Sequence, residues 1–356
     1  MSPVIRIRQC PRLGKGYAPY LIAEIGTNHN QDLNRAKDLV RVAAEAGFDC
    51  VKFQTYEPDE IVSPTVSARD YGLDKYYGDI SAVEMFARFL KTPKEWFPEL
   101  KKLCHDMNLD CATTIHGSHG LAWAKGIGFD VIKIASMDHN NIPFLESIAN
   151  AIDAPILVSF GMALLEDIGL AIRTLSPHRP GVGMLHCVSM YPPRPEELRL
   201  GNIPYMIQHF DVPVGFSDHA DDIITSAAAF ALGAVFFEKH ITLDRKLRGP
   251  DHPFALEPQK MKSYVNGIRS LSSELAAGQF VPPTPKEASI RAAYMKSVVA
   301  AHDLSTGKLL EFDDLTLVRP GTGIPPRDIH AVIGKTLKKP VARGIPLSWD
   351  DISEWR

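Results

Sequence analysis

The chain has 356 residues, of which 45% are hydrophobic and 23% are charged, and its formal net charge is −3. This ordinary globular composition offers no basic field for a nucleic acid, and no run of about 18 to 20 apolar residues that could cross a bilayer. The first residues lack the apolar core of a signal peptide, so we expect a cytoplasmic protein. Five cysteines lack paired spacing and are expected to be reduced core residues: Cys10, Cys50, Cys104, Cys111 and Cys187.

Short apolar, β-branched segments recur along the chain, and a segment with helical periodicity follows each of them. The predicted strands span 20–26, 50–56, 109–115, 131–136, 156–161, 183–188, 212–218 and 234–242. Strands that alternate with helices indicate βα units around a parallel sheet. Eight such units predict an α/β fold of the TIM (β/α)8 barrel type, whose active site lies at the C-terminal ends of the strands.

Two of the intervening helices have clear end signals. The first is predicted over 33–47, with an apolar face and Gly47 as a left-handed C-cap. The second is predicted over 92–107, with Thr92 as N-cap, Pro93 at the first helical position and Glu95 at the third. Between these helices, the long loop over 57–91 is typical of a functional lid or a partly ordered insertion.

The chain changes character after the last predicted barrel helix. The segment 278–289 contains three prolines and several polar residues, which indicates a linker. We therefore expect a barrel domain over 1–284, a linker over 285–296 and a small domain over 297–356. Short alternating segments separated by glycine and proline predict that this small domain is rich in strands.

Polar side chains end or follow every predicted barrel strand, where the strands should converge on one mouth. In chain order they are Glu24; Lys52 and Gln54; Thr113 and Thr114; Lys133, Ser136 and Asp138; Ser159; Ser189 and Tyr191; Ser217, Asp218 and His219; and Glu238, Lys239 and His240. Lysines with hydroxyl groups suit a substrate that carries a phosphate and a carboxylate. Two imidazoles suit a divalent metal that polarises a carbonyl oxygen. A single lysine or histidine here is more often structural, and the coincidence across strands favours a functional mouth.

An ordered series of motifs resembles the sialic acid synthase family. The motifs are AEIGTNHN (23–30), EAGFDCVKFQTY (45–56), VIKIASMDHNNIPFLESIA (131–149), PILVSFGMALLEDI (155–168), MLHCVSMYP (184–192), VGFSDHADD (214–222) and ALGAVFFEKHITLDRKLRGPDHPFALEP (231–258). Towards the end of the chain, SVVAAHDLSTGKLL and LVRPGTGI resemble the family's antifreeze-like (SAF) domain. The resemblance implies an enzyme that condenses phosphoenolpyruvate with N-acetylmannosamine or a related 2-acetamido sugar and releases phosphate by C–O cleavage.

The resemblance also implies roles for individual residues. Those that match the phosphoenolpyruvate site are Lys52, Thr114, Lys133, Ser136, Ser159, Ser189 and Ser217. Those that match sugar-binding positions are Glu24, Gln54, Tyr191 and Asp251. Asp138 matches the acidic residue that manages the attacking water, and the catalytic set implied is Asp138, Glu24, Lys52 and Lys133.

The resemblance further implies a metal and a partner. His219 and His240 match ligands of a divalent metal, which is Mn²⁺ in this interpretation, with Mg²⁺ or Co²⁺ as alternatives. Arg319 matches an arginine that the SAF domain extends into the active site of the partner subunit. A domain-swapped homodimer is therefore expected, with no nucleic acid or membrane partner.

Several positions depart from the family pattern. The turn TTIHGSH (113–119) replaces a Ser-Thr-Pro-Phe type turn, Ser189 replaces a common asparagine, and Asp138 is one methylene shorter than the usual glutamate. Three additional histidines near the mouth, His116, His119 and His139, are interpreted as solvated loop residues rather than as a second metal site. These departures leave the acceptor sugar open, although the intact GPDH motif favours the sialic and legionaminic branch. A pyruvate-dependent aldolase or lyase and a catalytically silent sugar-binding barrel are the alternative functions.

Overall fold

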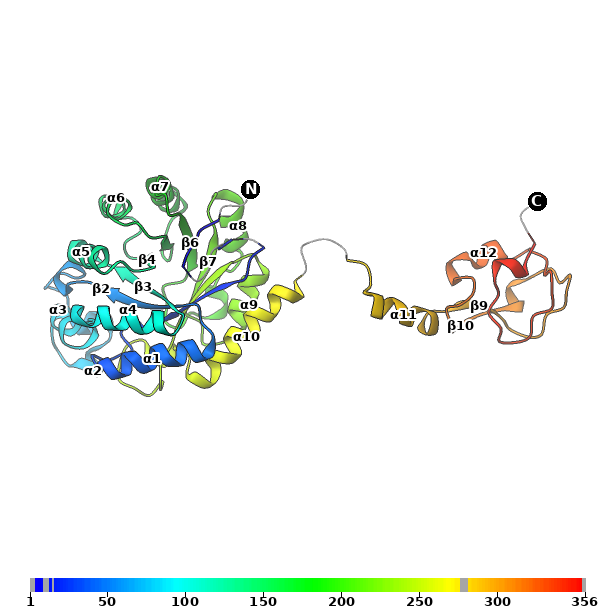
Figure 1. Ribbon diagram of the computed structural model, residues 1–356, viewed down its shortest axis with the longest axis horizontal. Coiled ribbons are helices and arrows are strands. Elements are labelled where there is room, and N and C mark those ends of the chain that lie inside the picture. Colours follow the sequence, from blue (N-terminus) through cyan, green and yellow to red (C-terminus); the bar gives the residue numbers. More distant parts are fainter. Residues whose placement is uncertain (1–3, 9–12, 15, 276–280, 354–356) are drawn as a thin grey trace. The chain divides into compact units, whose positions relative to one another are not determined.

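The computed structural model describes residues 4–8, 13–14, 16–275 and 281–353, and the chain divides into two compact units, 1–277 and 278–356. The first unit is a closed barrel of eight parallel strands (Figure 1). The strands are β1 (Tyr20–Glu24), β2 (Cys50–Thr55), β3 (Asp110–Ile115), β4 (Val131–Ile134), β5 (Ile156–Ser159), β6 (Val182–Cys187), β7 (Val214–Asp218) and β8 (Phe236–His240). Pairing of β8 with β1 closes the sheet, which confirms the predicted barrel. Strands β1, β4 and β5 are shorter than predicted because the chain enters a turn soon after each of them.

Helices cover the outside of the barrel (Figure 1). They are α1 (Leu33–Ala46), α4 (Phe97–Asp106), α5 (Gly117–Ile127), α6 (Ile142–Ala151), α7 (Leu165–Leu175), α8 (Asn202–His209), α9 (Ile224–Ala231) and α10 (Pro258–Glu274). The end signal predicted for α1 is confirmed, since Gly47 closes this helix with φ 90°. Short 3-10 turns lie over Lys94–Trp96, Pro195–Glu197 and His252–Phe254.

The predicted start of the helix after the long loop is wrong. Helix α4 begins at Phe97, after the 3-10 turn over Lys94–Trp96. Thr92 does not cap it, because its hydroxyl is buried and shares a 2.8 Å hydrogen bond with His29 Nε2. The hydrogen bond to His29 therefore engages the Thr92 side chain that the local sequence predicts as the helix cap.

Apolar side chains fill the N-terminal end of the barrel. Ile5 and Leu13 form an antiparallel bridge there. With Ile7 they pack against strand residues that include Tyr20, Ile22, Cys50, Ala112, Val131, Leu157, Leu185 and Phe236. Because side chains alternate along a strand, the next inward position lies two residues further on. That position is polar in several strands, with Glu24 after Ile22, Lys52 after Cys50 and Lys133 after Val131. The alternation thus stacks a polar layer on the apolar one, toward the C-terminal mouth.

The long loop over 57–91 is a folded insertion. It contains α2 (Asp74–Tyr77), α3 (Ala82–Met85), 3-10 turns over Pro58–Glu60 and Ala68–Tyr71, and a π-helical turn over Phe86–Leu90. Its own apolar cluster consists of Val62, Ala68, Ala82, Met85 and Leu90. The insertion is attached to the barrel by the Glu60 carboxylate, which accepts hydrogen bonds from the backbone of Ser118 and His119 at the start of α5.

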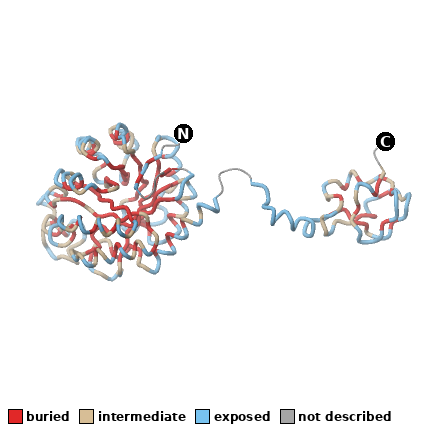
Figure 2. Tube along the Cα trace, viewed as in Figure 1, coloured by how far each residue is buried: buried red, intermediate tan, exposed pale blue. Residues whose placement is uncertain are grey.

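The second unit has a core of its own (Figure 2). It contains α11 (Pro285–Tyr294), β9 (Ser297–Ala300), β10 (Leu315–Val318), α12 (Ile329–Val332) and 3-10 turns over Phe312–Asp314, Pro326–Asp328 and Trp349–Asp351. Strands β9 and β10 pair antiparallel, and isolated bridges such as Leu304 with Val341 extend the pattern. Within the predicted linker 285–296, the residues of α11 are helical and none is buried.

Two further expectations concern the state of the cysteines and the possibility of a membrane-spanning helix. Cys50, Cys104, Cys111 and Cys187 are buried and free, while Cys10 lies outside the described residues. In the described parts of the chain, no helix has both the length and the apolar character that crossing a membrane requires.

Candidate active site

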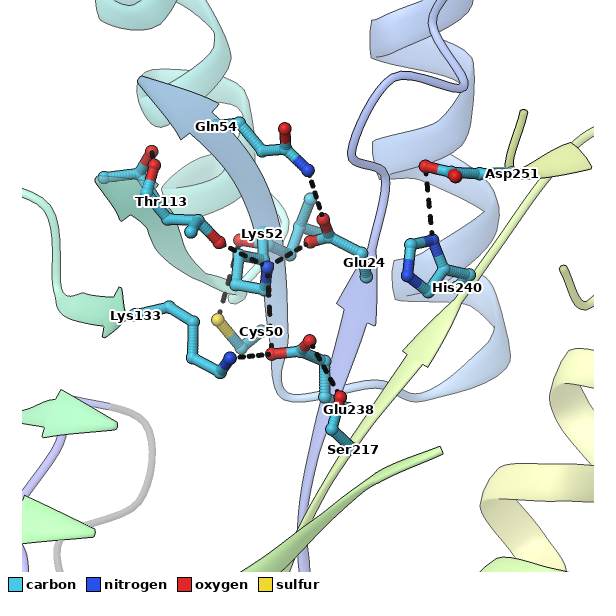
Figure 3. Close-up of polar contacts among 12 residues, drawn as sticks. Glu24, Cys50, Lys52, Gln54, Thr113, Lys133, Ser217, Glu238, His240 and Asp251 are labelled. Carbon is cyan, nitrogen blue, oxygen red and sulfur yellow. Dashed lines mark hydrogen bonds and ion pairs between the residues drawn. The ribbon is translucent and has the colours of Figure 1, made fainter. Parts of the chain in front are cut away.

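A buried network of carboxylates and ammonium groups lies in the barrel mouth (Figure 3). Lys52 Nζ lies 2.7 Å from Glu24 Oε2 and 3.7 Å from Glu238 Oε2. Lys133 Nζ lies 3.7 Å from the same Glu238 oxygen. The strand register explains the first contact, since it pairs Glu24 of β1 with Lys52 of β2. Two lysines and two carboxylates are therefore fixed together out of contact with bulk water.

Neutral side chains hold this network in place. Lys52 Nζ donates to Thr114 Oγ1 at 2.6 Å, and Gln54 Nε2 donates to Glu24 Oε1 at 3.1 Å. Ser217 Oγ donates to Glu238 Oε1 at 3.3 Å. The structure thus brings together six residues predicted for the site, Glu24, Lys52, Gln54, Thr114, Lys133 and Ser217. Glu238, a strand-end residue to which the sequence assigned no role, links Lys52 to Lys133.

Burial and mutual charge set the protonation states of the network. Burial raises the pKa of Glu24 to about 7, with Lys52 opposing the rise and Glu238 adding to it. Burial also raises the pKa of Glu238, but Lys133 and Lys52 outweigh it, and the net pKa lies below the usual value. Burial lowers the pKa of Lys133, while Glu238 and Glu24 outweigh burial at Lys52 and raise its pKa. Glu24 is therefore about half protonated near pH 7, which reduces the negative charge that an incoming anion meets.

The raised pKa of Glu24 predicts a pH-dependent stability. A folded-state pKa of about 7 against the usual 4.5 favours the neutral form, so this contribution is full below pH 4.5 and is lost as pH rises through 7. We expect the loss to reach roughly 3 kcal/mol in the free energy of unfolding. Urea unfolding between pH 4.5 and 7.5 measures it, with Glu24→Gln as the comparison, because glutamine stays neutral. Wild-type and variant curves that run parallel over this range would contradict the assignment.

Three serines and a glycine form a polar cradle at the ends of β4, β5 and β6. The Gly161 amide donates to Ser136 Oγ at 2.9 Å. A Cβ atom at Gly161 would lie 2.8 Å from Ser136 Oγ and would collide with Ser189 Oγ. Ser159 Oγ is buried and has no hydrogen-bond partner among the described residues. The Ser136 and Ser189 hydroxyl groups converge where only glycine fits, which suits the binding of a small anion.

His219 and His240 lie side by side at the ends of β7 and β8. Their ring centroids are 5.5 Å apart, and His219 Nδ1 donates to the Val188 carbonyl at 2.8 Å, which leaves its Nε2 as a lone-pair donor. His240 Nδ1 is buried, lies 3.6 Å from Asp251 Oδ2 and makes no hydrogen bond to a described residue. Burial, then His219 and nearby lysines, hold the pKa of His240 well below its usual value. At His219 burial also lowers the pKa, but Cys187 and the Val188 carbonyl outweigh it and the net pKa is raised. Binding of a metal requires the neutral form of both imidazoles.

Two adjacent imidazoles, one with an orphaned ring nitrogen, fit a divalent transition metal. In residues 4–8, 13–14, 16–275 and 281–353, no group of three or more His, Cys, Asp or Glu side chains has the arrangement of a metal site. A pair of imidazoles would leave positions on a metal open, which fits a catalytic metal better than a closed structural one.

The residues predicted to contact a sugar surround Gly26, which follows β1 with φ 52°. A Cβ atom there would lie 2.9 Å from Glu24 Oε1 and 3.3 Å from both Gln54 Nε2 and Asp251 Oδ2. Tyr191 is half exposed, and its ring centroid is 4.2 Å from that of His219. The sugar-side residues thus meet next to the histidine pair. Arg319 lies in the second unit, where it donates to the Tyr294 carbonyl at 3.0 Å.

The interpretation of the additional histidines as solvated is wrong for two of the three. His116 and His139 are only 6% and 5% exposed, whereas His119 has a largely exposed side chain. His116 Nδ1 contacts Asp138 Oδ2 at 2.6 Å, and His139 Nδ1 donates to the Ser136 carbonyl at 2.6 Å. These contacts depend on how neighbouring strand ends meet, so the local sequence could not show them.

Comparison with known proteins identifies the family. The NeuB family model matches residues 39–280, and the SAF domain model matches residues 296–353. N,N'-diacetyllegionaminic acid synthase from Legionella pneumophila is 33% identical to this chain over 95% of it and 96% of the relative. N-acetylneuraminate-9-phosphate synthase from Homo sapiens is 32% identical over 93% of this chain and 92% of the relative.

Solved structures show the same similarity. N-acetylneuraminic acid synthetase from Leptospira borgpetersenii, in complex with citrate, matches with a TM-score of 0.71 and 29% identity, over 82% of this chain and 96% of that structure. The spore coat polysaccharide biosynthesis protein SpsE from Bacillus subtilis matches with a TM-score of 0.67 and 28% identity, over 99% and 100%. The barrel, its polar mouth and these similarities over nearly the whole chain together establish that this protein is an enzyme of the NeuB family that carries an SAF domain.

Proposed function

We propose that this enzyme is a nonulosonic acid synthase, which condenses phosphoenolpyruvate with a 2-acetamido sugar and releases inorganic phosphate. The observation that carries the proposal is the buried layer of Lys52 and Lys133, which lies in the same mouth as His219 and His240. An anion site beside a candidate metal site is what a phosphorylated acid and a sugar carbonyl together require.

Binding of phosphoenolpyruvate falls to the lysines and the serine cradle. Lys52 and Lys133 supply charge, and Thr114, Ser136, Ser159, Ser189 and Ser217 supply directional hydroxyl groups for the phosphate and carboxylate. Ser159 Oγ, which has no partner among the described residues, is free to donate to the substrate. The same cations then stabilise the charge on the departing phosphate.

The sugar lies on the other side of the mouth, against Glu24, Gln54, Tyr191 and Asp251. A divalent metal held by His219 and His240, for which we propose Mn²⁺, would polarise the sugar aldehyde as a Lewis acid. Asp251 Oδ2 lies 3.6 Å from His240 Nδ1, beyond hydrogen-bond distance, and it also faces the sugar. These side chains set the position of the aldehyde relative to C3 of the enolpyruvate.

The bond changes follow from this arrangement. C3 of the enolpyruvate attacks the aldehyde carbon, the C=O π electrons move to the aldehyde oxygen, which takes up a proton to become a hydroxyl group, and positive charge develops at C2. Water controlled by Asp138 adds at C2 and loses a proton. The tetrahedral intermediate then collapses to the ketone with cleavage of the bond between C2 and the phosphate oxygen.

A substrate panel tests the function and the identity of the sugar together. The enzyme is incubated with phosphoenolpyruvate, Mn²⁺ and a series of 2-acetamido and 2,4-diacetamido hexoses, and phosphate and product mass are measured. Phosphate release with one of these sugars is expected. Absence of release with every sugar would contradict the proposal. Pyruvate without phosphate would support the aldolase alternative, and sugar binding that ignores Mn²⁺, without turnover, would support the silent barrel.

Substitution of Gly161 should weaken phosphoenolpyruvate binding. The Cβ atom of Gly161→Ala would collide with Ser189 Oγ, so the serine cradle must open. Overpacking of this kind costs about 1–3 kcal/mol, which corresponds to a roughly ten- to hundredfold rise in KM for phosphoenolpyruvate. Steady-state kinetics measure it, and the KM for the sugar should change little. An unchanged KM for phosphoenolpyruvate would contradict the assignment of the cradle to this substrate. Gly267→Ala is the matched control, because no atom lies within 4 Å of a Cβ there.

We also propose that the enzyme acts as a domain-swapped homodimer in which the partner subunit's Arg319 reaches the sugar. Arg319→Ala should then raise the KM for the sugar far more than the KM for phosphoenolpyruvate. Kinetics with both substrates varied, combined with sedimentation analysis of the variant, measure this. A monomeric wild-type enzyme, or unchanged sugar kinetics in the variant, would overturn the role of Arg319.

A further inference from the structure

We propose that His116 and Asp138 act as one acid–base dyad, in which Asp138 orients the imidazole and His116 Nε2 takes the proton of the water that adds at C2. The inference rests on the proposed function and deepens it. Asp138 then acts on the water through His116, a residue outside the set predicted from the sequence. The contacts of His116 and Asp138 with each other and with their neighbours support this dyad.

The contact between the two residues is short and buried. His116 Nδ1 and Asp138 Oδ2 are 2.6 Å apart, and the His116 and Asp138 side chains are 8% and 17% exposed. Because a carboxylate oxygen accepts here, Nδ1 of the neutral imidazole donates and Nε2 keeps its lone pair. Nε2 makes no hydrogen bond to a residue in the described part of the chain. An imidazole held by a carboxylate at one nitrogen and open at the other is the arrangement of a general base.

The backbone directs His116 into the mouth. His116 follows β3 with extended dihedral angles, φ −130° and ψ 133°, and its amide continues the ladder by donating to the Thr55 carbonyl at 3.1 Å. Alternation along an extended chain therefore places its side chain on the same side as Thr114, two residues earlier. Thr114 points inward, since it accepts from Lys52 Nζ. His116 thus continues the inward polar row one step beyond the anion site.

Asp138 comes to this point from the neighbouring strand. It follows β4 two residues after Ser136, whose hydroxyl belongs to the cradle at Gly161. Both members of the dyad therefore lie two residues beyond a residue of the anion site, on adjacent strands. A water held there would be next to the bound phosphoenolpyruvate.

Other groups around His116 do not compete for this role. The Tyr56 ring meets the imidazole edge to face, with centroids 6.1 Å apart, and limits its rotation. Glu60, from the insertion, contacts the following turn, where its oxygens accept hydrogen bonds from the amides of Ser118 and His119. Asp138 is thus the carboxylate that the structure pairs with His116.

The proposed step conserves atoms and charge. The water oxygen forms a bond to C2, one O–H bond breaks, and its proton moves to His116 Nε2, which gives an imidazolium stabilised by Asp138. When the intermediate collapses, the hydroxyl electrons form the C2 carbonyl and the bond from C2 to the phosphate oxygen breaks. Of the two protons that the water supplies, one goes to the alkoxide formed from the sugar aldehyde, which becomes a hydroxyl group, and the other goes to the released phosphate.

Kinetics of matched variants separate this role from a purely structural one. His116→Asn keeps an N–H donor where Nδ1 lies but has no base, so kcat for phosphate release should fall roughly 10²-fold or more, with an unchanged KM for phosphoenolpyruvate. Asp138→Asn should lower kcat similarly, and the double variant should be no slower than the slower single variant. His119→Asn, on the exposed side of α5, should match the wild type. If His116→Asn retains wild-type kcat while Asp138→Asn does not, His116 only positions Asp138 and the proposal is overturned.

A second measurement does not need turnover. The ¹⁵N shifts of histidine-labelled enzyme, with His116 assigned by its loss in His116→Asn, should show a ring protonated at Nδ1 and bare at Nε2. Asp138→Asn should disturb that tautomer. A ring protonated at Nε2 in the wild type would overturn the dyad, even if no sugar in the panel is turned over. Failure of the proposed function would instead appear as an inactive wild-type enzyme.

Discussion

Removal of either imidazole of the histidine pair should abolish metal-dependent turnover. We expect His219→Ala and His240→Ala to release phosphate at least roughly 10³-fold more slowly than the wild type at saturating Mn²⁺, because Lewis-acid catalysis contributes several kcal/mol. Each variant would retain one imidazole of the proposed metal site. Calorimetric titration with Mn²⁺ should show correspondingly weaker binding in both variants.

An exposed histidine outside the pair provides the control for these variants. His209→Ala removes an exposed imidazole on α8, whose Nδ1 contacts the carbonyl of Tyr205, and it should leave turnover and Mn²⁺ affinity unchanged. Circular dichroism establishes that the site variants remain folded. Folded His219→Ala enzyme with wild-type turnover would show that the pair does not hold the catalytic metal.

Substitution of Lys52 should give the largest loss of stability. Lys52→Met leaves the buried Glu24 and Glu238 without their shared cation, and an uncompensated buried charge costs about 3–5 kcal/mol. Chemical unfolding at pH 7 measures the loss. The loss should shrink at acid pH, because protonation then removes the charge on both carboxylates.

Two comparisons make this prediction specific. Lys102→Met breaks an exposed helical pair with Asp106 and should cost less than about 1 kcal/mol. Lys52→Met combined with Glu24→Gln should recover part of the stability, since the fraction of Glu24 that is ionised at pH 7 is then removed. A loss in Lys52→Met no larger than that in Lys102→Met would mean that the network in the mouth does not bear the charges described.

The sequence predicts much of this architecture because its strongest signals are local. Apolar segments in alternation with helices indicate the barrel, and polar residues at the strand ends indicate the mouth. Lys52 and Lys133 follow directly from this pattern. Glu238 and Lys239 show the limit of this pattern, since they are neighbours near the end of the same strand, β8. Only the register assigns Glu238 to the mouth, whereas Lys239 turns away and pairs with Asp218 at 3.1 Å.

Failures of the sequence-based predictions have one physical cause. Thr92 has the surroundings of an N-cap, and His116 has those of a solvated turn, yet each is buried by a partner that lies far away in the sequence. His29 binds the hydroxyl of Thr92, and Asp138 binds the imidazole of His116. At both positions a tertiary contact overrides the conformational preference of the local sequence. Such contacts form where the strand ends converge.

Isotope tracing tests the central claim most directly. Phosphoenolpyruvate labelled with ¹⁸O at the oxygen that bridges C2 and phosphorus is incubated with Mn²⁺ and the acceptor sugar found in the panel. C–O cleavage requires the label to leave with the phosphate, and the product ketone should take its oxygen from water. Label retained in the ketone of the product, with unlabelled phosphate released, would contradict the account of this enzyme as a synthase that adds water at C2.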